Sequence, residues 1–461
     1  MNFRKLFYVT ALACAVLAVN GCKKDDFKEE TKDEVVKPIA LSVQMNPLTV
    51  NGDTIPVTNT TVKITNMINN AEYTQQADAS GLIVFNELLP GRYSINASLN
   101  LTASEYNAIT GDRVTEDVAF NQSLSNQDLR TDTTLHLDLL ASKVGDWVIK
   151  QVYYAGSNIS TGASFRDVFI EIYNNSNTTL YADSLVIAEA YGKLSNSAAT
   201  NLQDNGQYDW ALSIGNSGIN KANTDYIYAS GMYMIPSNAT KTLYPVEPGQ
   251  SLILAATGIN HTGAYNDVNG DPVSVIDPTL TVDLSGVDFE VFAYPYKVAL
   301  DPTYSQYKFD LDNPNVPNIN ILHFASGQDF VMDALGRESY VIVEPSASFN
   351  YANLVKVPIS SATSITSTTS LYARIPVANV IDGVEIQHPV SSSRVPRRLP
   401  TSIDAGAYNI PNGQYSSQSA VRKTKRIVDG RRILQDTNNS AVDFGFLNKA
   451  DATKSASSFI D

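Results

Sequence analysis

Residues 78–93 of the chain read Asp78-Ala-Ser-Gly-Leu-Ile-Val-Phe-Asn-Glu-Leu-Leu-Pro-Gly-Arg-Tyr93. An apolar run lies between two turn sequences, a pattern typical of one strand followed by a tight connection and a second strand. Gly81 and Gly91 permit tight turns, and Phe85 and Tyr93 are large enough to fill the space between two sheets. The stretch therefore predicts two strands of a β-sandwich joined by a tight turn.

The sequence around this stretch continues the pattern of half-buried strands. Alternating apolar and polar residues occur at Ile39–Met45, Thr61–Thr65, Leu82–Phe85, Tyr93–Leu99 and Leu135–Leu140. About seven such runs in about 100 residues predict an immunoglobulin-like β-sandwich over residues 39–142. Residues 78–93 also resemble the central hairpin of carboxypeptidase-regulatory-like and Cna-B-like modules, in which D-x-x-G-x-x-x-F precedes L-x-P-G-x-Y. The resemblance implies a spacer or binding platform.

Residues 143–461 form a second, larger β-rich region in this interpretation. The run Phe169-Ile-Glu-Ile-Tyr-Asn174 is followed by a turn and another apolar run, and Pro248-Gly249 precedes the run Ser251–Ala255. These pieces resemble lamin-tail immunoglobulin-like domains, with long insertions between the matching parts. No long window keeps a helical apolar stripe, so we expect few and short helices. The predicted fold class is all-β.

The order of several short segments resembles one protein family as a whole. They are Asp146-Trp147, Phe169–Asn174, Val287–Glu290 and Leu434–Ser440. The chain is similar in these segments to a Bacteroidetes surface lipoprotein family, domain of unknown function 4876. This resemblance implies a lineage and a surface location, and it implies no activity.

The N-terminus predicts export with a lipid anchor. Arg4 and Lys5 precede an apolar run, Leu6–Val19, which is shorter than the roughly 20 residues that a membrane span needs. The run ends before Gly21-Cys22, which resembles the lipobox of bacterial lipoproteins. The resemblance implies that residues 1–21 are a signal peptide and that Cys22 carries lipid. The alternative is an ordinary secretory signal.

Residues 22–38 are charged and lack apolar periodicity, which is typical of a flexible tether. The acidic cluster after Cys22 resembles the surface-export signal of Bacteroidetes lipoproteins. We therefore expect a protein that is lipid-anchored in the outer membrane and faces the cell exterior. The alternative is a tether that is charged only because it is solvated.

The composition narrows the possible functions. The 461-residue chain carries 33 Lys and Arg against 47 Asp and Glu, a net charge of −14. Nucleic-acid binding requires a basic footprint, so we expect no nucleic-acid partner. Two cysteines and four scattered histidines give no disulfide scaffold and no metal-binding or catalytic motif. We expect no enzyme and assign no catalytic residue.

Two groups of residues are candidate binding sites. Asp267, Asn269 and Asp271, and farther along Asp310 and Asp312, place oxygen atoms at alternating positions, as calcium loops do. The alternative is that these residues simply make exposed turns. A second group consists of Tyr226, Tyr228 and Tyr233. Exposed tyrosines at this spacing would stack on sugar rings, and buried ones would be sandwich core.

Basic residues are concentrated at the C-terminal end. Residues 391–461 contain 11 Lys and Arg against six Asp and Glu, and Arg394, Arg397 and Arg398 open the segment. They would contact the acidic body, an anionic surface glycan or a partner.

Three functions remain open from the sequence. The first is a surface lipoprotein that binds a ligand or assists an outer-membrane TonB-dependent nutrient transporter. The second is a structural or adhesive surface protein, and the third is a hydrolase built on the lamin-tail-like region. The sequence determines neither the ligand nor the oligomeric state.

Overall fold

The computed structural model describes residues 36–461 except 51–52, 112–116, 142–145, 347 and 429. Residues 39–461 form one compact unit, separate from residues 1–38. Cys22, the predicted signal peptide and nearly all of the predicted tether lie outside the described residues. Within the described residues, no helix has both the length and the apolar character that a membrane crossing requires.

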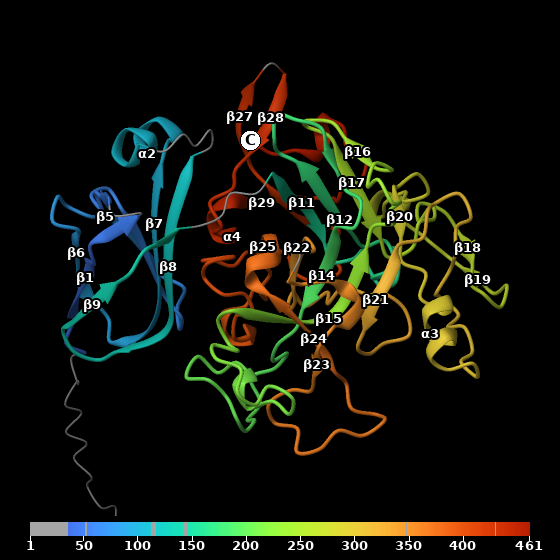
Figure 1. Ribbon diagram of the computed structural model, residues 1–461, viewed down its shortest axis with the longest axis horizontal. Coiled ribbons are helices and arrows are strands. Elements are labelled where there is room, and N and C mark those ends of the chain that lie inside the picture. The colour runs from blue at the N-terminus through green and yellow to red at the C-terminus, as the bar shows by residue number, and fades with distance from the viewer. Residues whose placement is uncertain (1–35, 51–52, 112–116, 142–145, 347, 429) are drawn as a thin grey trace, which may run out of the picture. The chain divides into compact units, whose positions relative to one another are not determined.

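Residues 39–141 form two facing sheets, drawn in blue and cyan in Figure 1. One sheet has the order β6-β1-β9, with bounds Leu82–Leu88, Ile39–Met45 and Thr133–Leu137. The other has the order β10-β8-β7-β4-β5, with bounds Leu140–Ala141, Val118–Leu129, Gly91–Leu101, Thr61–Asn66 and Glu72–Gln76. A hairpin of β2 (Leu48–Val50) and β3 (Asp53–Ile55) and helix α2 (Ala103–Thr110) accompany the sheets.

The prediction of a hairpin over residues 78–93 is wrong, because β6 pairs with β1 in one sheet and β7 pairs with β4 and β8 in the other. Residues 89–90 therefore carry the chain from one sheet of the sandwich to the other. Phe85 and Tyr93 are each 1% exposed and lie in the core of this sandwich. Gly81 adopts a φ of 79°, a left-handed conformation that glycine tolerates without strain. Gly91 instead begins strand β7, so the prediction that it supplies a tight turn is wrong. The bend there is fixed by the Tyr93 hydroxyl, which donates to the Leu89 carbonyl at 2.7 Å.

Two larger sheets build the rest of the unit. A six-stranded sheet has the order β20-β17-β12-β11-β26-β29, with bounds Phe289–Glu290, Ser251–Ala255, Phe169–Asn174, Trp147–Tyr153, Ser419–Arg422 and Phe444–Leu447. The seven-stranded sheet has the order β23-β24-β15-β14-β22-β25, with bounds Lys356–Val357, Tyr372–Pro376, Tyr226–Met234, Val186–Ala190, Ser339–Val343 and Val380–Glu385, and β21 (Asn320–Phe324) pairs with β15.

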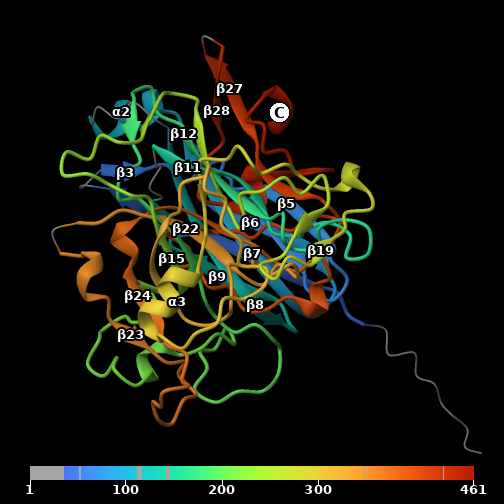
Figure 2. The ribbon, with the colours of Figure 1, turned by 90° about the vertical axis from the view of Figure 1, so that its right-hand side faces the viewer.

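Three short pairs of strands and two further helices lie outside these sheets. The pairs are β13 (Leu180–Tyr181) with β16 (Pro245–Val246), β18 (Tyr265–Asn266) with β19 (Pro272–Val273), and β27 (Thr424–Val428) with β28 (Arg431–Leu434). The helices are α3 (Tyr294–Leu300) and α4 (Ser440–Asp443). The β27–β28 hairpin projects near the C-terminus in both ribbon views (Figure 1, Figure 2). Three short helices among the described residues confirm the all-β prediction.

The core of the larger region lies between the six- and seven-stranded sheets. Residues of both sheets, such as Ile172 and Ile342, are completely buried in one cluster. The other face of the seven-stranded sheet is also buried, because long insertions cover Val186 and Val341. Burial on both faces explains why strands such as β14 lack alternation. The two sheets are also joined by a buried ion pair, Arg422 to Asp382, at 2.6 Å.

Candidate functional site

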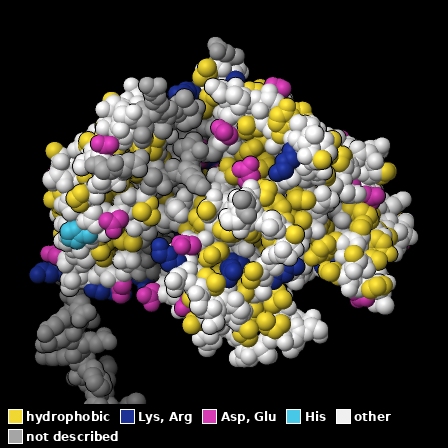
Figure 3. Space-filling view, in the orientation of Figure 1, with side chains coloured by type: hydrophobic (Ala, Val, Ile, Leu, Met, Phe, Trp, Pro, Cys, Tyr) yellow, Lys and Arg dark blue, Asp and Glu magenta, His cyan; other side chains and the backbone are white. Residues whose placement is uncertain are grey.

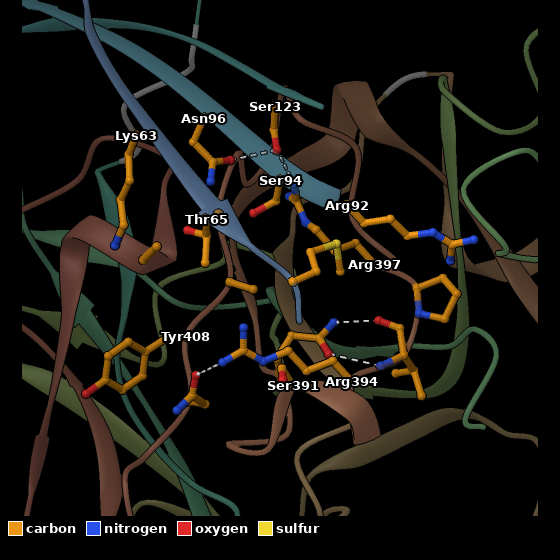
Figure 4. Close-up of a pocket in the computed structure, with 18 of the residues that line it drawn as sticks. Lys63, Thr65, Arg92, Ser94, Asn96, Ser123, Ser391, Arg394, Arg397 and Tyr408 are labelled. Carbon is orange, nitrogen blue, oxygen red and sulfur yellow. Dashed lines mark hydrogen bonds between the residues drawn. The ribbon is translucent and has the colours of Figure 1, made fainter. Parts of the chain in front are cut away.

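A cavity of about 790 Å³ lies between the outer face of the five-stranded sheet and residues 387–409. Strands β4, β5, β7 and β8 supply one wall. Figure 4 shows Lys63, Thr65, Ser94 and Asn96 on this wall, with Ser391, Arg394, Arg397 and Tyr408 opposite them. The two walls come from segments separated by about 300 positions in the sequence.

Strand alternation places the polar side chains on the first wall. In β4, Val62 and Ile64 point into the sandwich core, so Lys63 and Thr65 point outward. Strand β7 alternates in the same way and turns Ser94 outward. The register pairs Lys63 with Asn96 and Thr65 with Ser94 on the neighbouring strand. The four polar side chains therefore form one contiguous patch.

The opposite wall is an irregular loop that its own side chains hold in place. Gln387 donates from Nε2 to the Val395 carbonyl at 3.0 Å and accepts from the Val395 amide at 3.3 Å. Arg394 donates from Nε to the His388 carbonyl at 3.0 Å and from Nη2 to Asn409 Oδ1 at 3.1 Å. These bonds satisfy the loop backbone and fix the Arg394 guanidinium at the cavity.

Arg397 connects the two walls. Its Nη1 donates to Ser123 Oγ at 3.2 Å and to the Ala405 carbonyl at 3.0 Å. Ser123 Oγ in turn donates to Asn96 Oδ1 at 2.7 Å, so a hydrogen-bonded chain runs from the loop to β7 (Figure 4). The cavity is consequently bounded by groups that already hold each other in position.

The cavity is positively charged although the chain as a whole is acidic. Four cations, Lys63, Arg92, Arg394 and Arg397, line it together with one acid, Glu72. Lys63 Nζ lies 2.9 Å from Glu72 Oε1. On the face that Figure 3 shows, by contrast, basic and acidic side chains are interspersed.

Burial and nearby charge both act on the cavity side chains. Partial burial lowers the pKa of Arg394, and the Glu72 carboxylate opposes this shift. Burial raises the pKa of the Tyr408 hydroxyl to about 12. Both groups therefore keep their protons at neutral pH and act as hydrogen-bond donors.

Several polar groups of the cavity are available to a ligand. Within the part of the chain that the structure describes, the hydroxyls of Thr65, Ser94, Ser391 and Tyr408 make no side-chain hydrogen bond. Each hydroxyl can both donate and accept. The arrangement thus suits a polar ligand with many hydroxyl groups.

The residues predicted to bind calcium accept or donate hydrogen bonds within the fold. Asp267 Oδ1 accepts from the Asn269 and Asp271 amides at 2.9 and 3.0 Å, which is the geometry of an Asx turn. Asp310 Oδ1 accepts from the Ala293 amide at 2.9 Å beside the start of α3. Among the described residues, no three His, Cys, Asp or Glu side chains gather in a group that could hold a metal ion.

Asp312 belongs to the same set of candidate calcium ligands. Its Oδ1 accepts from Asn318 Nδ2 at 2.8 Å, which again ties neighbouring parts of one loop together. The Asx turn, the alternative drawn from the sequence, is seen at residues 267–271. Asp310 is buried instead, and calcium binding at Asp310 and Asp312 stays a prediction.

The three candidate tyrosines lie in or against the core. Tyr228 is 2% exposed and Tyr233 is fully buried. The Tyr228 hydroxyl donates to the Ala222 carbonyl at 3.0 Å, and the Tyr233 hydroxyl donates to Glu189 Oε2 at 3.2 Å. Tyr226 is half-buried beneath the Arg374 guanidinium. Core packing, the alternative to ligand binding, therefore accounts for Tyr228 and Tyr233.

Sequence reasoning identified only part of the cavity. It singled out Arg394 and Arg397 by their local charge, but it passed over Lys63, Thr65 and Ser94. Their signal is the polar half of an alternating strand, which any solvated sheet face also shows. What distinguishes them is the loop opposite, and no local pattern predicts that contact.

Comparisons with known proteins show similarity to one family and give no function. Residues 247–451 match the model of the family described as a protein of unknown function, DUF4876, which confirms the resemblance inferred from the sequence. No curated protein matches the chain. A solved DUF4876 family protein from Bacteroides thetaiotaomicron VPI-5482 is 22% identical, with 88% of this chain and 95% of that chain covered and a TM-score of 0.47.

Two other solved structures show weaker similarity. A Pseudomonas aeruginosa protein named for carbohydrate binding is 14% identical, with 22% of this chain and 89% of that chain covered and a TM-score of 0.17. A Bacteroides ovatus ATCC 8483 protein named as an adhesin is 11% identical, with 39% and 60% covered and a TM-score of 0.17. These similarities are too weak to indicate a function.

Proposed function

We propose that this chain is a cell-surface protein that binds a saccharide in the cavity between the five-stranded sheet and residues 387–409. One observation carries the proposal: polar side chains of β4 and β7 face hydroxyl and guanidinium groups of the loop across about 790 Å³. A volume of this size accommodates a ligand of a few sugar rings, and ligand sites commonly fall between about 300 and 1,000 Å³.

Saccharides fit the chemistry of the lining. A sugar presents many hydroxyls that each need a donor or an acceptor when they leave water. Thr65, Ser94 and Ser391 supply both, and Asn96 supplies an amide. Tyr408 adds a half-buried aromatic ring at the edge of the cavity (Figure 4). A ring of this kind offers an apolar face for the C–H side of a sugar.

A blocking variant tests the proposal directly. Thr65→Trp fills the cavity without changing its charge and should abolish saccharide binding by the purified full chain. Thr61→Trp is the matched control, because Thr61 lies on the same face of β4 but outside the cavity. Binding to a panel of oligosaccharides, followed by calorimetry, is the measurement. Equal binding by the two variants would place the ligand elsewhere.

The lipid anchor and outward orientation are part of the same proposal. We propose that Cys22 is acylated and that residues 22–38 tether the binding unit outside the outer membrane. Labelling with a radioactive fatty acid should mark the wild-type chain and not Cys22→Ser. External protease should degrade the chain on intact cells. Protection from protease on intact cells would contradict the outward orientation.

We also propose that the bound saccharide is delivered to an outer-membrane TonB-dependent transporter. The support is the expected surface location together with a ligand cavity. Affinity purification from detergent-solubilised outer membranes should capture such a transporter. If saccharide binding is absent and no transporter is captured, a structural or adhesive role replaces the proposal.

A further inference from the structure

We infer that the ligand of this cavity carries a negatively charged group, and that Glu72 is a specificity-determining residue that competes with this group for Lys63. The inference rests on the proposed saccharide function and deepens it. It assigns a ligand class, an anionic saccharide, and it assigns a role to the one acid in the lining.

The first support is the charge of the lining. Four cations and one acid line the cavity, in a chain whose net charge is −14. The buried Asp404 carboxylate next to Arg397 balances that cation, so Lys63, Arg92 and Arg394 remain against Glu72. A neutral ligand needs no such excess, and collecting like charges around a cavity is unfavourable without a counter-charge. An anionic ligand group would supply that charge.

The second support is the hydrogen-bonding capacity that the cations retain. Arg394 uses Nε and Nη2 for loop contacts, and its Nη1 makes no hydrogen bond within the described part of the chain. The Arg92 side chain is exposed on β7 and makes no hydrogen bond or ion pair with the described residues. Guanidinium groups are well suited to carboxylate and sulfate, because their planar donors match two oxygens at once.

The third support is the position of Glu72. It lies on the edge strand β5, whose five residues are all exposed, and it pairs in register with Thr65. Its carboxylate contacts Lys63 Nζ at 2.9 Å. The same carboxylate attracts the Arg394 guanidinium on the opposite wall and raises its pKa against the effect of burial. Glu72 thus occupies the position that a ligand anion would take between the two walls.

The contact between Glu72 and Lys63 is exchangeable. The two side chains are 52% and 36% exposed, and ion pairs in water contribute little. An anionic oligosaccharide that places one charged group on Lys63 and Arg394 and another near Arg92 gains more than the single contact it replaces. Glu72 would therefore leave Lys63 when such a ligand binds, and it would disfavour ligands that lack the charge.

Two ligand groups share this chemistry, the carboxylate of a uronic acid and the sulfate ester of a sulfated sugar. The experiment separates them with three oligosaccharides of equal length: one sulfated, one built of uronic acid and one neutral. Calorimetry on the full chain compares wild type, Glu72→Gln and Arg92→Gln. Asp461→Asn is the matched control, because it removes an acid from an exposed ion pair with Arg432, and both residues lie outside the cavity lining.

Glu72→Gln should raise the affinity for at least one anionic oligosaccharide by about two- to fivefold, the equivalent of an exposed ion pair. Arg92→Gln should lower it, Asp461→Asn should leave it unchanged, and added salt should weaken binding. The neutral oligosaccharide should bind more weakly than the anionic ones. Weaker binding of every ligand by Glu72→Gln would overturn the inference, because Glu72 would then be a direct acceptor for ligand hydroxyls.

A small probe separates this inference from the proposed function. Inorganic sulfate at constant ionic strength should raise the melting temperature of wild type, and raise it more for Glu72→Gln. If no saccharide binds but sulfate raises the melting temperature, the saccharide proposal fails and the anion site stands. If saccharides bind without regard to charge and sulfate has no effect, the inference fails and the proposed function stands.

Discussion

Asp167 should make the stability of this protein fall as the pH rises from acid to neutral. The residue precedes β12 and is completely buried. The Tyr153 and Ser157 hydroxyls approach its carboxyl oxygens at 3.2 and 3.4 Å. Burial outweighs these hydrogen bonds and raises the pKa of Asp167 from 3.8 to about 7. The folded protein therefore holds a proton there that the unfolded chain has already lost.

The size of the effect follows from the difference in pKa. Each pKa unit corresponds to about 1.4 kcal/mol, so a rise from 3.8 to about 7 amounts to about 4 kcal/mol over the whole titration. The folded-state pKa is the higher one, so the free energy of unfolding is unaffected below about pH 4 and decreases as the pH rises through about 7. Between pH 4.5 and pH 8, wild type should lose about 3 kcal/mol through this one group.

Asp167→Asn removes the titration and keeps the shape of the side chain. Urea unfolding of both proteins at pH 4.5, 6 and 8 should show that the variant gains about 3 kcal/mol on wild type across this range. Asp301→Asn is the control: hydrogen bonds from Thr303 lower the pKa of Asp301, so its replacement acts in the opposite direction. Parallel pH profiles for wild type and Asp167→Asn would refute the reasoning.

Three further predictions concern buried groups. Arg422→Met should destabilise the fold by about 3–5 kcal/mol in urea unfolding, because it leaves Asp382 as an uncompensated buried acid; the double variant with Asp382→Asn should recover part of the loss. Gly156→Ala should destabilise by about 1–3 kcal/mol or more, since φ is 66° there and a Cβ would overlap the Ser164 carbonyl; an unchanged melting temperature would contradict this. Trp210 is 4% exposed and stacked on a tyrosine, so its fluorescence should shift to the red on unfolding, and Trp210→Phe should show which part of the signal it supplies.

The strands of the first sandwich were predictable because each carries its own local signal. The alternation in Ile39–Met45 matches β1 in both bounds, and inward residues of β4 such as Val62 are completely buried. The run Leu135–Leu140 was less well predicted. In the structure β9 ends at Leu137 and the chain enters the other sheet at Leu140, a change of partner that alternation alone does not reveal.

The long insertions were harder to interpret. Tyr228 and Tyr233 have the same spacing and composition whether they are exposed or buried, and only the elements packed against β15 make them core. The aspartates at 267 and 310 pose the same problem, because one pattern serves both calcium loops and Asx turns. At Asp267 one oxygen accepts from the Asn269 and Asp271 amides, and the turn explains the pattern there; at Asp310 the bonded amide belongs to Ala293, which is distant in the sequence.

The sequence by itself determined the all-β class, the inward face of each alternating strand and the excess of acidic residues, because these depend on residue type and short-range spacing. Only the tertiary structure decided what each outward face meets. Lys63 and Thr65 would be ordinary surface residues if Arg394 and Tyr408 did not lie opposite them. This contact depends on how whole sheets and loops pack. It therefore forms a cavity from residues that no local sequence pattern groups together.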